Sequence, residues 1–466
     1  MSNAAAVIAT DVPGRPTVPL PLSHLVRISA YWLGLTAIDA AVGLVVQNRI
    51  QFDGFVSALE VGRALFFVGV GGAIVSIIVQ PTVGSISDYT VSRWGRRKPF
   101  IVIGSLLDVV FLLGIAYANS LVALAAFVIL LSFSTNVARG PFQGYVPDLT
   151  PERQVGMASA LVGLMQILGN VTGFAIASVA AGYGDIPLAL VAVAVVELVT
   201  MLSVVLRVGR GQPPNPRDGR SWADIAKGTW ATDILRERSY VYLVASRLFF
   251  LMGGGILVNL IIAYLNQVHG LDQKAANETN LSLLAIVVVA NLLAIIPAAR
   301  LSDRIGRKPI IYASTLIGGT GVGLAALAPT IPVALLGGAL FGASAGMFLS
   351  VDWALMTDII PRAAAGRYMG LSNVATGSST PLSIATGGIV VDLVNSTLGL
   401  GTGPRAAYLL GVVYYVVAAV LLRNVTEPRR GRTGPPLRAQ PEERPDPIEH
   451  QPPNERRTGE GVTAPD

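Results

Sequence analysis

The sequence is poor in charged side chains. Lys, Arg, Asp and Glu make up 13% of its 466 residues, whereas hydrophobic residues make up 52%. An ordinary soluble domain is about 25% charged, and a soluble chain of this length would divide into domains with charged surfaces. These few charges cannot cover such surfaces, so the composition favours a protein that is dissolved in lipid.

Cysteine is absent, and the three histidines, His24, His269 and His450, are scattered along the chain. Disulfides and thiolate metal sites are therefore excluded, and we predict no metal site. The sequence also has no Walker loop and no nucleophile elbow, so we predict neither an enzyme nor a cofactor. Residues 1–22 have no separate apolar core followed by a small-residue cleavage site, so we expect no cleaved signal peptide.

Long apolar runs fill most of the chain. A helix needs about 20 mostly apolar residues to cross the hydrocarbon core of a bilayer. Twelve runs meet this requirement, at residues 24–47, 61–86, 99–118, 121–146, 155–182, 186–206, 241–267, 279–300, 309–328, 332–357, 367–394 and 405–423. We therefore predict an all-α membrane protein with twelve transmembrane helices.

Basic residues are distributed unevenly between alternate loops. If both chain ends lie in the cytoplasm, the cytoplasmic loops hold basic clusters such as residues 93–98, whereas the opposite loops hold Arg49, Lys274 and Arg405. The positive-inside rule favours this orientation. The net charge of +6 is then a topology signal rather than a sign of nucleic-acid binding, and we predict a multi-pass protein of the cell (plasma or inner) membrane.

Two polar segments interrupt the apolar pattern. Within residues 207–240, one face of a helix would be formed by Trp222, Ile225, Ala226, Trp230 and Ile234. This predicts an amphipathic helix on the membrane surface, the alternative being a plain linker. The Pro-, Arg- and Glu-rich residues 424–466 cannot form a core and are predicted to be disordered. The predicted parts are an N-terminal segment at residues 1–22, a six-helix bundle at 23–207, a linker at 208–239, a second six-helix bundle at 240–423 and a tail at 424–466.

The two halves of the chain repeat one another. Alignment of "GRRKP", ending at Pro99, with "GRKP", ending at Pro309, gives an offset of 210. The same offset relates three further pairs, Asp148 and Asp358, Pro151 and Pro361, and Gly156 and Gly366. Four landmarks in register indicate two homologous six-helix halves.

These motifs resemble the major facilitator superfamily, whose signature is a G-x-x-x-D-x-x-G-R-[RK] loop between helices two and three. The stretches "VQPTVGSISDYTVSRWGRRKPFIVIGS" and "RGPFQGYVPDLT" are similar to those of the sucrose/proton symporters of the glycoside–cation symporter group. The sucrose carriers place an arginine after the Gly-Pro of the fourth helix, where this chain has Gln143. Its own arginine, Arg139, precedes Gly140 and Pro141.

The resemblance implies that the charged loops form a conformational latch, which holds an outward-facing state and breaks as the halves rock. Its residues, with their repeats in the second half, would be Gly84, Asp88, Gly95, Arg96, Arg97, Asp148, Asp303, Gly306, Arg307 and Asp358. The alternative is that these residues only mark topology, since exposed ion pairs contribute about 0–1 kcal/mol.

Charged residues also occur inside the apolar segments, where a charge at mid-bilayer costs at least about 2.5–3.5 kcal/mol. Asp39, Arg139, Arg247 and Asp352 fall on the first, fourth, seventh and tenth helices, one each. The resemblance implies that these four helices line a central cavity. We predict that Asp39 takes up a coupling proton and that Arg139 links it to the substrate. The alternative is a permanent structural ion pair.

Asp108 and Glu197, on the third and sixth helices, are candidates either for a second proton site or for carboxyls hydrogen-bonded within the bundle. Sugar ligands prefer amide partners and an aromatic plate. The candidates for substrate contacts are Tyr31, Trp32, Asn136, Gln143, Gln166, Asn170, Asn373 and Trp353. Each amide taken alone also fits a helix–helix contact, worth about 0.6 kcal/mol.

The favoured function is proton-coupled symport of a glycoside or small oligosaccharide by alternating access. One alternative is proton-coupled export of another amphiphilic solute, and the other is a non-transporting membrane sensor. The expected partners are the small-molecule substrate, protons and the lipid bilayer, without nucleic acid, and the protein is expected to function as a monomer.

Overall fold

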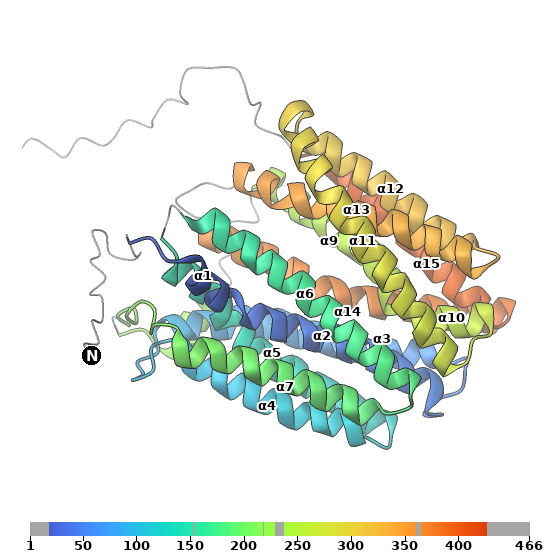
Figure 1. Cartoon of the computed structure of the whole chain (residues 1–466), viewed down its shortest axis with the longest axis horizontal. Helices are drawn as coiled ribbons and strands as arrows, with labels where there is room; N and C mark the ends of the chain where they lie inside the picture. The colour runs from blue at the N-terminus through green and yellow to red at the C-terminus, as the bar shows by residue number, and fades with distance from the viewer. Residues whose placement is uncertain (1–17, 152–153, 218, 229–236, 360–364, 426–466) are drawn as a thin grey trace, which may run out of the picture. The chain divides into compact units, whose positions relative to one another are not determined.

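The computed structural model (Figure 1) describes residues 18–151, 154–217, 219–228, 237–359 and 365–425. Its first half contains seven helices, α1 (Leu22–Ser29), α2 (Tyr31–Phe52), α3 (Val61–Asp88), α4 (Lys98–Tyr117), α5 (Leu121–Leu149), α6 (Val155–Gly182) and α7 (Ile186–Arg207). The rest contains α8 (Trp222–Gly228), α9 (Arg238–Asn259), α10 (Ile261–His269), α11 (Gln273–Ile305), α12 (Arg307–Leu327), α13 (Ile331–Ile359), α14 (Ala365–Leu398) and α15 (Thr402–Arg423).

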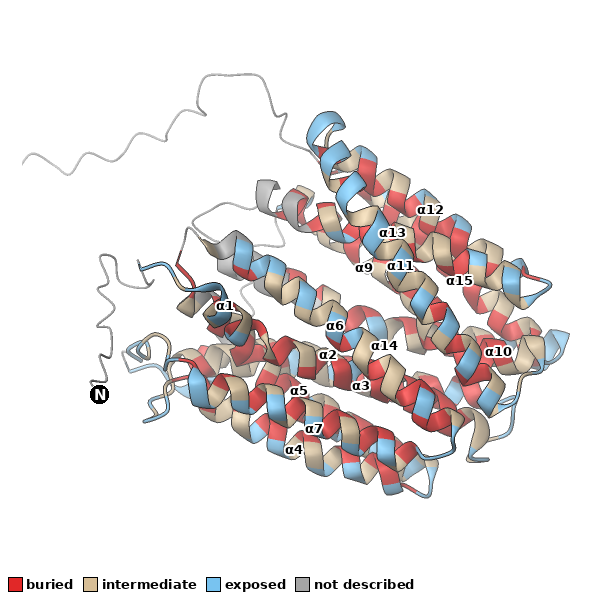
Figure 2. Ribbon diagram, in the orientation of Figure 1, coloured by how far each residue is buried: buried red, intermediate tan, exposed pale blue. Residues whose placement is uncertain are grey.

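Twelve of the described helical segments are long and apolar enough to cross a membrane. The first of them is the continuous stretch Leu22–Phe52, formed by α1 and α2. Large apolar side chains are exposed on the outward faces of several helices, among them Val110, Leu202 and Leu293 (Figure 2). Such surfaces are stable in lipid rather than in water. The prediction of a twelve-span all-α membrane protein is confirmed.

Local sequence sets where several helices begin. The Asp185 and Asp272 side chains accept hydrogen bonds from the backbone N–H of Leu188 and Ala275, three residues into α7 and α11. Side-chain acceptors at this position satisfy N–H groups that have no partner inside the helix. The spans therefore begin at polar residues that flank the apolar runs.

The helices form two bundles. Helices α2 to α7 pack on one another, and α9 to α15 form the second bundle. The two bundles meet along α3 and α14 and along α6 and α11. One pair of contacts displays the internal repeat: Lys98 Nζ donates to the Val208 carbonyl at 2.7 Å, and Lys308 Nζ donates to the Val425 carbonyl at 2.6 Å. The two lysines differ by the offset of 210 and hold the end of the last helix of their own bundle.

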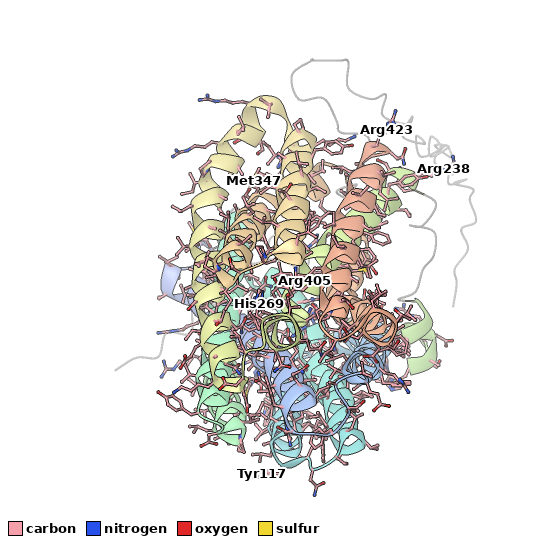
Figure 3. The ribbon with its side chains drawn as sticks, turned by 90° about the vertical axis from the view of Figure 1, so that its right-hand side faces the viewer. Tyr117, Arg238, His269, Met347, Arg405 and Arg423 are labelled. Atoms are coloured by element: carbon pink, nitrogen blue, oxygen red, sulfur yellow. The ribbon has the colours of Figure 1, made fainter. Side chains whose placement is uncertain are left out.

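The bundles are joined at one end by amide side chains. Asn48 Nδ2 donates to Asn277 Oδ1 at 3.1 Å, and Asn277 Nδ2 donates back to Asn48 Oδ1 at 2.6 Å. Gln51 Nε2 donates to Asn266 Oδ1 at 2.8 Å. We call these four residues the amide clasp and their end of the bundles the amide end; Figure 3 looks onto this end, with His269 and Arg405 near the middle of the view.

The opposite end carries residues 89–97 and is called the basic end. Between pairs of described residues, the hydrogen bonds that connect the two bundles all lie toward the amide end. Helices α6 and α11 lie closer together there than at the basic end (Figure 1). The structure is therefore closed at the amide end.

A short helix, α8, lies within the segment that was predicted to form a surface helix. Helix α8 covers seven residues, buries Ile225 and leaves Trp222 exposed beneath the Arg217 guanidinium. Hydrogen bonds from Ser221 to the Asp224 carboxylate hold the pKa of Asp224 below its ordinary value. Trp230 and Ile234 lie outside the described residues, as does the tail from residue 426 onward.

Candidate functional site

The charged residues of the first half meet inside the membrane. Arg139 on α5 forms an ion pair with Asp39 on α2, with 2.5 Å between Arg139 Nη2 and Asp39 Oδ2. The Asp39 side chain is 48% exposed and that of Arg139 is 16% exposed. Asp39 lies near the middle of the span Leu22–Phe52, where an exposed charge is stable facing water rather than lipid.

The second half repeats this pair with the charges exchanged. Arg247 on α9 pairs with Asp352 on α13 at 3.0 Å, and Arg247 Nη1 also donates to Ser372 Oγ on α14 at 3.2 Å. Here the side chains are 7% and 4% exposed. The first bundle thus carries the acid on its first helix, and the second bundle carries it on its fourth. Only the first of these two pairs has an acid open to water.

The aromatic candidates lie inside the first bundle. Tyr31 is fully buried, with its ring edge against Phe142 at 4.9 Å between centroids and its hydroxyl 2.6 Å from Ser105 Oγ. Trp32 is 8% exposed and lies against the same Phe142 ring. In this conformation neither ring forms an open plate for a sugar.

The amide candidates divide into two groups. Asn136 is buried and donates to Ser76 Oγ at 3.0 Å and to the Ser132 carbonyl at 2.7 Å, so it connects α5 to α3. Gln143 and Gln166 are half-buried, and Asn170 on α6 is exposed. The side chains of Asn373 and Trp353 lie outside the described residues.

A cavity of about 310 Å³ lies between the bundles, with α6 on one side and α9, α10, α11 and α13 on the other. Its lining is mainly apolar and includes Phe174 and Phe341. Three amides, Asn170, Asn280 and Asn291, supply its polar groups. Asn291 Oδ1 is buried and has no hydrogen-bond partner among the described residues.

Asn280 and Asn291 were not among the residues that the sequence predicted. Asn291 follows a run of apolar and β-branched residues, "AIVVVAN", in which an amide is conspicuous. An unpaired polar group inside a membrane helix is costly, and this could have marked Asn291 as a functional candidate.

The loop of the first half forms a compact ionic network at the basic end. Arg97 Nη2 lies 2.8 Å from Asp88 Oδ1, and Arg97 Nε lies 2.7 Å from Asp148 Oδ2. Arg96 Nη2 reaches the same Asp148 oxygen at 2.6 Å. Both arginines are buried, and every member belongs to the first bundle. Between the described residues this network therefore joins α3 and α5 through the loop before α4.

Close packing and turn geometry explain the glycines of this motif. Gly84 lies against Gly140, where a Cβ at Gly84 would be 3.5 Å from the Gly140 backbone. Gly95 has a φ of 95° and Gly306 a φ of 97°, in the left-handed region that disfavours other residues. The equivalent glycines of the two halves thus both have a positive φ. The side chain of Asp358 lies outside the described residues, so the second network stays a prediction.

The remaining membrane carboxyls, Asp108 and Glu197, are both fully buried inside the first bundle. Asp108 Oδ1 accepts hydrogen bonds from Ser134 and Thr135 of α5. Glu197 Oε1 accepts one from the Tyr31 hydroxyl at 3.2 Å. These two acids lie apart from the lining of the cavity between the bundles.

Most of the chain matches the family model of the Major Facilitator Superfamily, over residues 28–291 and 274–451. Among curated proteins, sucrose transport protein SUC3 of Arabidopsis thaliana is 30% identical over 143 residues, which are 26% of this chain and 24% of that protein. Sucrose transport protein SUT4 of Oryza sativa subsp. indica is 27% identical over 209 residues, 37% of this chain and 35% of the relative. The matched segments thus span about a quarter to a third of these relatives.

Solved structures share the fold. A bacterial homologue of the human lysosomal transporter Spinster, in an inward-facing and occupied conformation, aligns with a TM-score of 0.67 at 14% identity, covering 86% of this chain and 96% of that one. A D-xylose–proton symporter aligns with a TM-score of 0.63 at 16% identity, covering 86% and 97%. At these identities the likeness concerns the fold alone.

Proposed function

The chain belongs to the major facilitator superfamily, and on this basis we propose that it is a secondary active transporter that carries a glycoside or small oligosaccharide together with protons. We place it in a cell membrane as a monomer with both termini in the cytoplasm. The observation that carries the proposal is the water-exposed Asp39–Arg139 ion pair within the first bundle.

The chemistry of this pair suits coupled transport. A carboxylate and a guanidinium both form strong, directional hydrogen bonds with sugar hydroxyls. A substrate that draws Arg139 toward itself removes the cation beside Asp39. Since a nearby cation favours the charged form of a carboxyl, Asp39 then binds a proton more readily. Substrate and proton thus favour each other's binding.

Alternating access requires two arrangements of the bundles. The hydrogen bonds of the amide clasp support the proposal that these residues form a gate, which is closed in this conformation. Opening of the clasp, together with closure of the basic end, would expose Asp39 and Arg139 to the other side. The ionic network of Asp88, Arg97 and Asp148 holds one bundle together during this movement, so the bundle moves as a unit.

Two observations support a sugar as the substrate. First, the curated relatives named above, which match part of this chain, are sucrose transport proteins. Second, the cavity amides Asn170, Asn280 and Asn291 provide donors and acceptors for hydroxyl groups. The sucrose carriers share an arginine at the position where this chain has Gln143. We therefore propose a glycoside as the substrate class and not sucrose in particular.

The test is counterflow of labelled glycosides in proteoliposomes, with and without a pH gradient. We expect at least one glycoside to exchange, and to accumulate when a proton gradient is imposed. No exchange across a broad panel of mono-, di- and trisaccharide glycosides would overturn the sugar proposal and leave the family assignment standing.

Asp39→Asn examines the coupling separately. The amide cannot exchange a proton but can still accept a hydrogen bond from Arg139. We expect gradient-driven accumulation to fall by about tenfold or more, while counterflow, which needs no net proton movement, changes by about twofold or less. Undiminished proton uptake with the substrate in Asp39→Asn would show that Asp39 does not carry the coupling proton.

Export of an amphiphilic solute is the second candidate, and the mainly apolar lining of the cavity favours it. Inverted vesicles loaded with protons and offered an amphiphilic fluorescent cation or a neutral lipophilic drug provide the test. Proton-driven uptake into these vesicles, without any glycoside exchange, would favour export over symport.

A further inference from the structure

A pair of acids is sealed inside the first bundle, away from the cavity. Asp108 on α4 and Glu197 on α7 have no solvent-exposed surface. Their carboxyl groups lie within hydrogen-bonding reach of each other. The helices that carry them, α4 and α7, pack directly together. The pair is therefore a contact between two membrane spans of one bundle.

Each acid has one oxygen with donors and one without. Asp108 Oδ1 accepts from Ser134 Oγ and from Thr135 Oγ1, the latter at 2.9 Å. Glu197 Oε1 accepts from the Tyr31 hydroxyl at 3.2 Å. Asp108 Oδ2 and Glu197 Oε2 are buried and have no hydrogen-bond partner among the described residues.

Two adjacent carboxylates cannot satisfy these oxygens, because an ionised carboxylate only accepts hydrogen bonds. Two like charges side by side in a dry interior also repel strongly. One proton removes both problems, because it converts one acid into a donor to the other. Pairs of carboxyls that share one proton are a known arrangement in proteins.

The charged and titratable groups around the pair are few. Tyr31 faces it from α2, and Arg139 acts on Asp108 from α5. Helix α6, which packs on α2 and α7, carries no ionisable side chain between Val155 and Gly182. Arg139 is thus a cation that acts on the pair. The same guanidinium forms the ion pair with the exposed Asp39.

We propose that Asp108 and Glu197 form a second proton-binding site, which holds one shared proton inside the first bundle and is linked through Arg139 to the exposed Asp39. This inference rests on the proposed function in that the substrate is taken to act on Arg139. The pair itself is a proton site whatever that substrate is.

The link works through the position of one cation. With Arg139 beside Asp108, its positive charge disfavours the shared proton. When a substrate or Asp39 draws the guanidinium away from Asp108, the pair binds a proton from water more tightly. When Arg139 returns, the proton leaves to water. The proton is only bound and released, so no other bond forms or breaks and no further reactant is needed.

Infrared spectroscopy of the purified protein tests the shared proton directly. The wild type at neutral pH should show the carbonyl stretch of a protonated carboxylic acid, shifted in D₂O. Asp108→Asn and Glu197→Gln should each lose this band, because the remaining carboxylate then accepts from the new amide. Glu278→Gln, which removes an exposed acid of α11, is the matched control and should retain it.

A band of equal size in both variants would overturn the proposal, because no proton would then reside on the pair. Each amide can occupy the space of the carboxyl and supply the missing donor, so both variants should fold. Thermal unfolding of Asp108→Asn and Glu197→Gln checks this. If one variant does not fold, Tyr31→Phe removes the hydroxyl that donates to Glu197 and contacts Ser105, and it should change the frequency of the band.

Proteoliposomes test the link to transport. In Asp108→Asn, counterflow of the substrate should persist, whereas the protons taken up with each substrate, measured with a pH-sensitive dye, should fall or lose their pH dependence. If the band disappears but proton uptake is unchanged, the proton is structural and the link through Arg139 is wrong. If wild-type counterflow is itself absent, the proposed function fails, while the infrared result still decides the proton site.

Discussion

Arg97 is held from three directions, and its surroundings show why single residues at the basic end matter. Its guanidinium contacts Asp88 and Asp148 and donates to the Pro141 carbonyl at 2.9 Å. The charge is buried, and removal of a partner from a buried ion pair is much more costly than loss of an exposed one. The network therefore contributes to the stability of the first bundle as well as to any latch.

Gly144→Ala tests this network without removing a charge. A Cβ at Gly144 would lie 1.8 Å from Arg97 Nη1, so an alanine must displace the guanidinium. Loss of charged hydrogen bonds should lower the free energy of unfolding by about 1–3 kcal/mol, seen as a lower Tm of the purified protein. Gly163→Ala on α6 is the control, because nothing lies within 4 Å of its added Cβ. Equal Tm values for the two variants would contradict the expectation.

At the scale of elements, the two bundles use one device to hold their last helix. Lys98 and Lys308 stand at the start of α4 and α12, and each donates to carbonyls at the end of α7 or just after α15. A cation at a helix C-terminus satisfies carbonyls that have no partner within the helix and opposes the negative end of the helix dipole. The repeat in the sequence thus corresponds to a repeated contact.

Lys98→Met keeps most of the side-chain length and removes the donor. Because Lys98 is 7% exposed, the freed Val205 and Val208 carbonyls stay poorly hydrated, and we expect a loss of about 1–3 kcal/mol in thermal or denaturant unfolding. Lys308→Met should act in the same direction in the second bundle. Lys274→Met is the control, since that side chain is 66% exposed. No difference between Lys98→Met and the control would mean that water replaces the lysine without cost.

The sequence predicted the spans and the pairing of charges well, and the rotation of the helices poorly. Apolar length alone defines a span, and charges inside a bilayer must pair with opposite charges, as Asp39 and Arg139 do. Whether a side chain faces the cavity or the bundle core depends on how a whole helix is rotated by its neighbours. Tyr31 and Trp32 were therefore expected at the substrate and lie in the core instead.

The cavity and the acid pair show the same limit. Asn280 and Asn291 meet Asn170 only because α11 passes beside α6, far away in the sequence. The similar depth of Asp108 and Glu197 was visible from helix lengths, but their contact requires that α4 and α7 present these two faces to each other. No local pattern in either segment encodes that orientation.

At the scale of the whole molecule, the amide clasp joins the two bundles at the closed end. Asn48 and Asn277 are fully buried and bond to each other in both directions, across the boundary between the bundles. Since these groups are neutral amides, the strength of the clasp should depend little on salt or pH, unlike a gate made of ion pairs. In the proposed transport cycle, the clasp would therefore set a fixed bias toward closure of the amide end.

Asn277→Leu should shift the bundles toward a state that is open at the amide end. The change removes both hydrogen bonds to Asn48 and leaves that amide buried without its partner, a loss of about 1–3 kcal/mol and so about a 5- to 150-fold shift in the ratio of the two states. Because the chain has no cysteine, Tyr183→Cys in the first bundle and Leu327→Cys in the second provide the only two sites for spin labels. Double electron–electron resonance between them should show a longer distance gaining population in Asn277→Leu.

Ser282→Ala, which removes a hydroxyl that bonds within α11 alone, should keep the parent distribution. If Asn277→Leu also keeps it, the packing of α3 on α14, and not the clasp, holds the amide end closed.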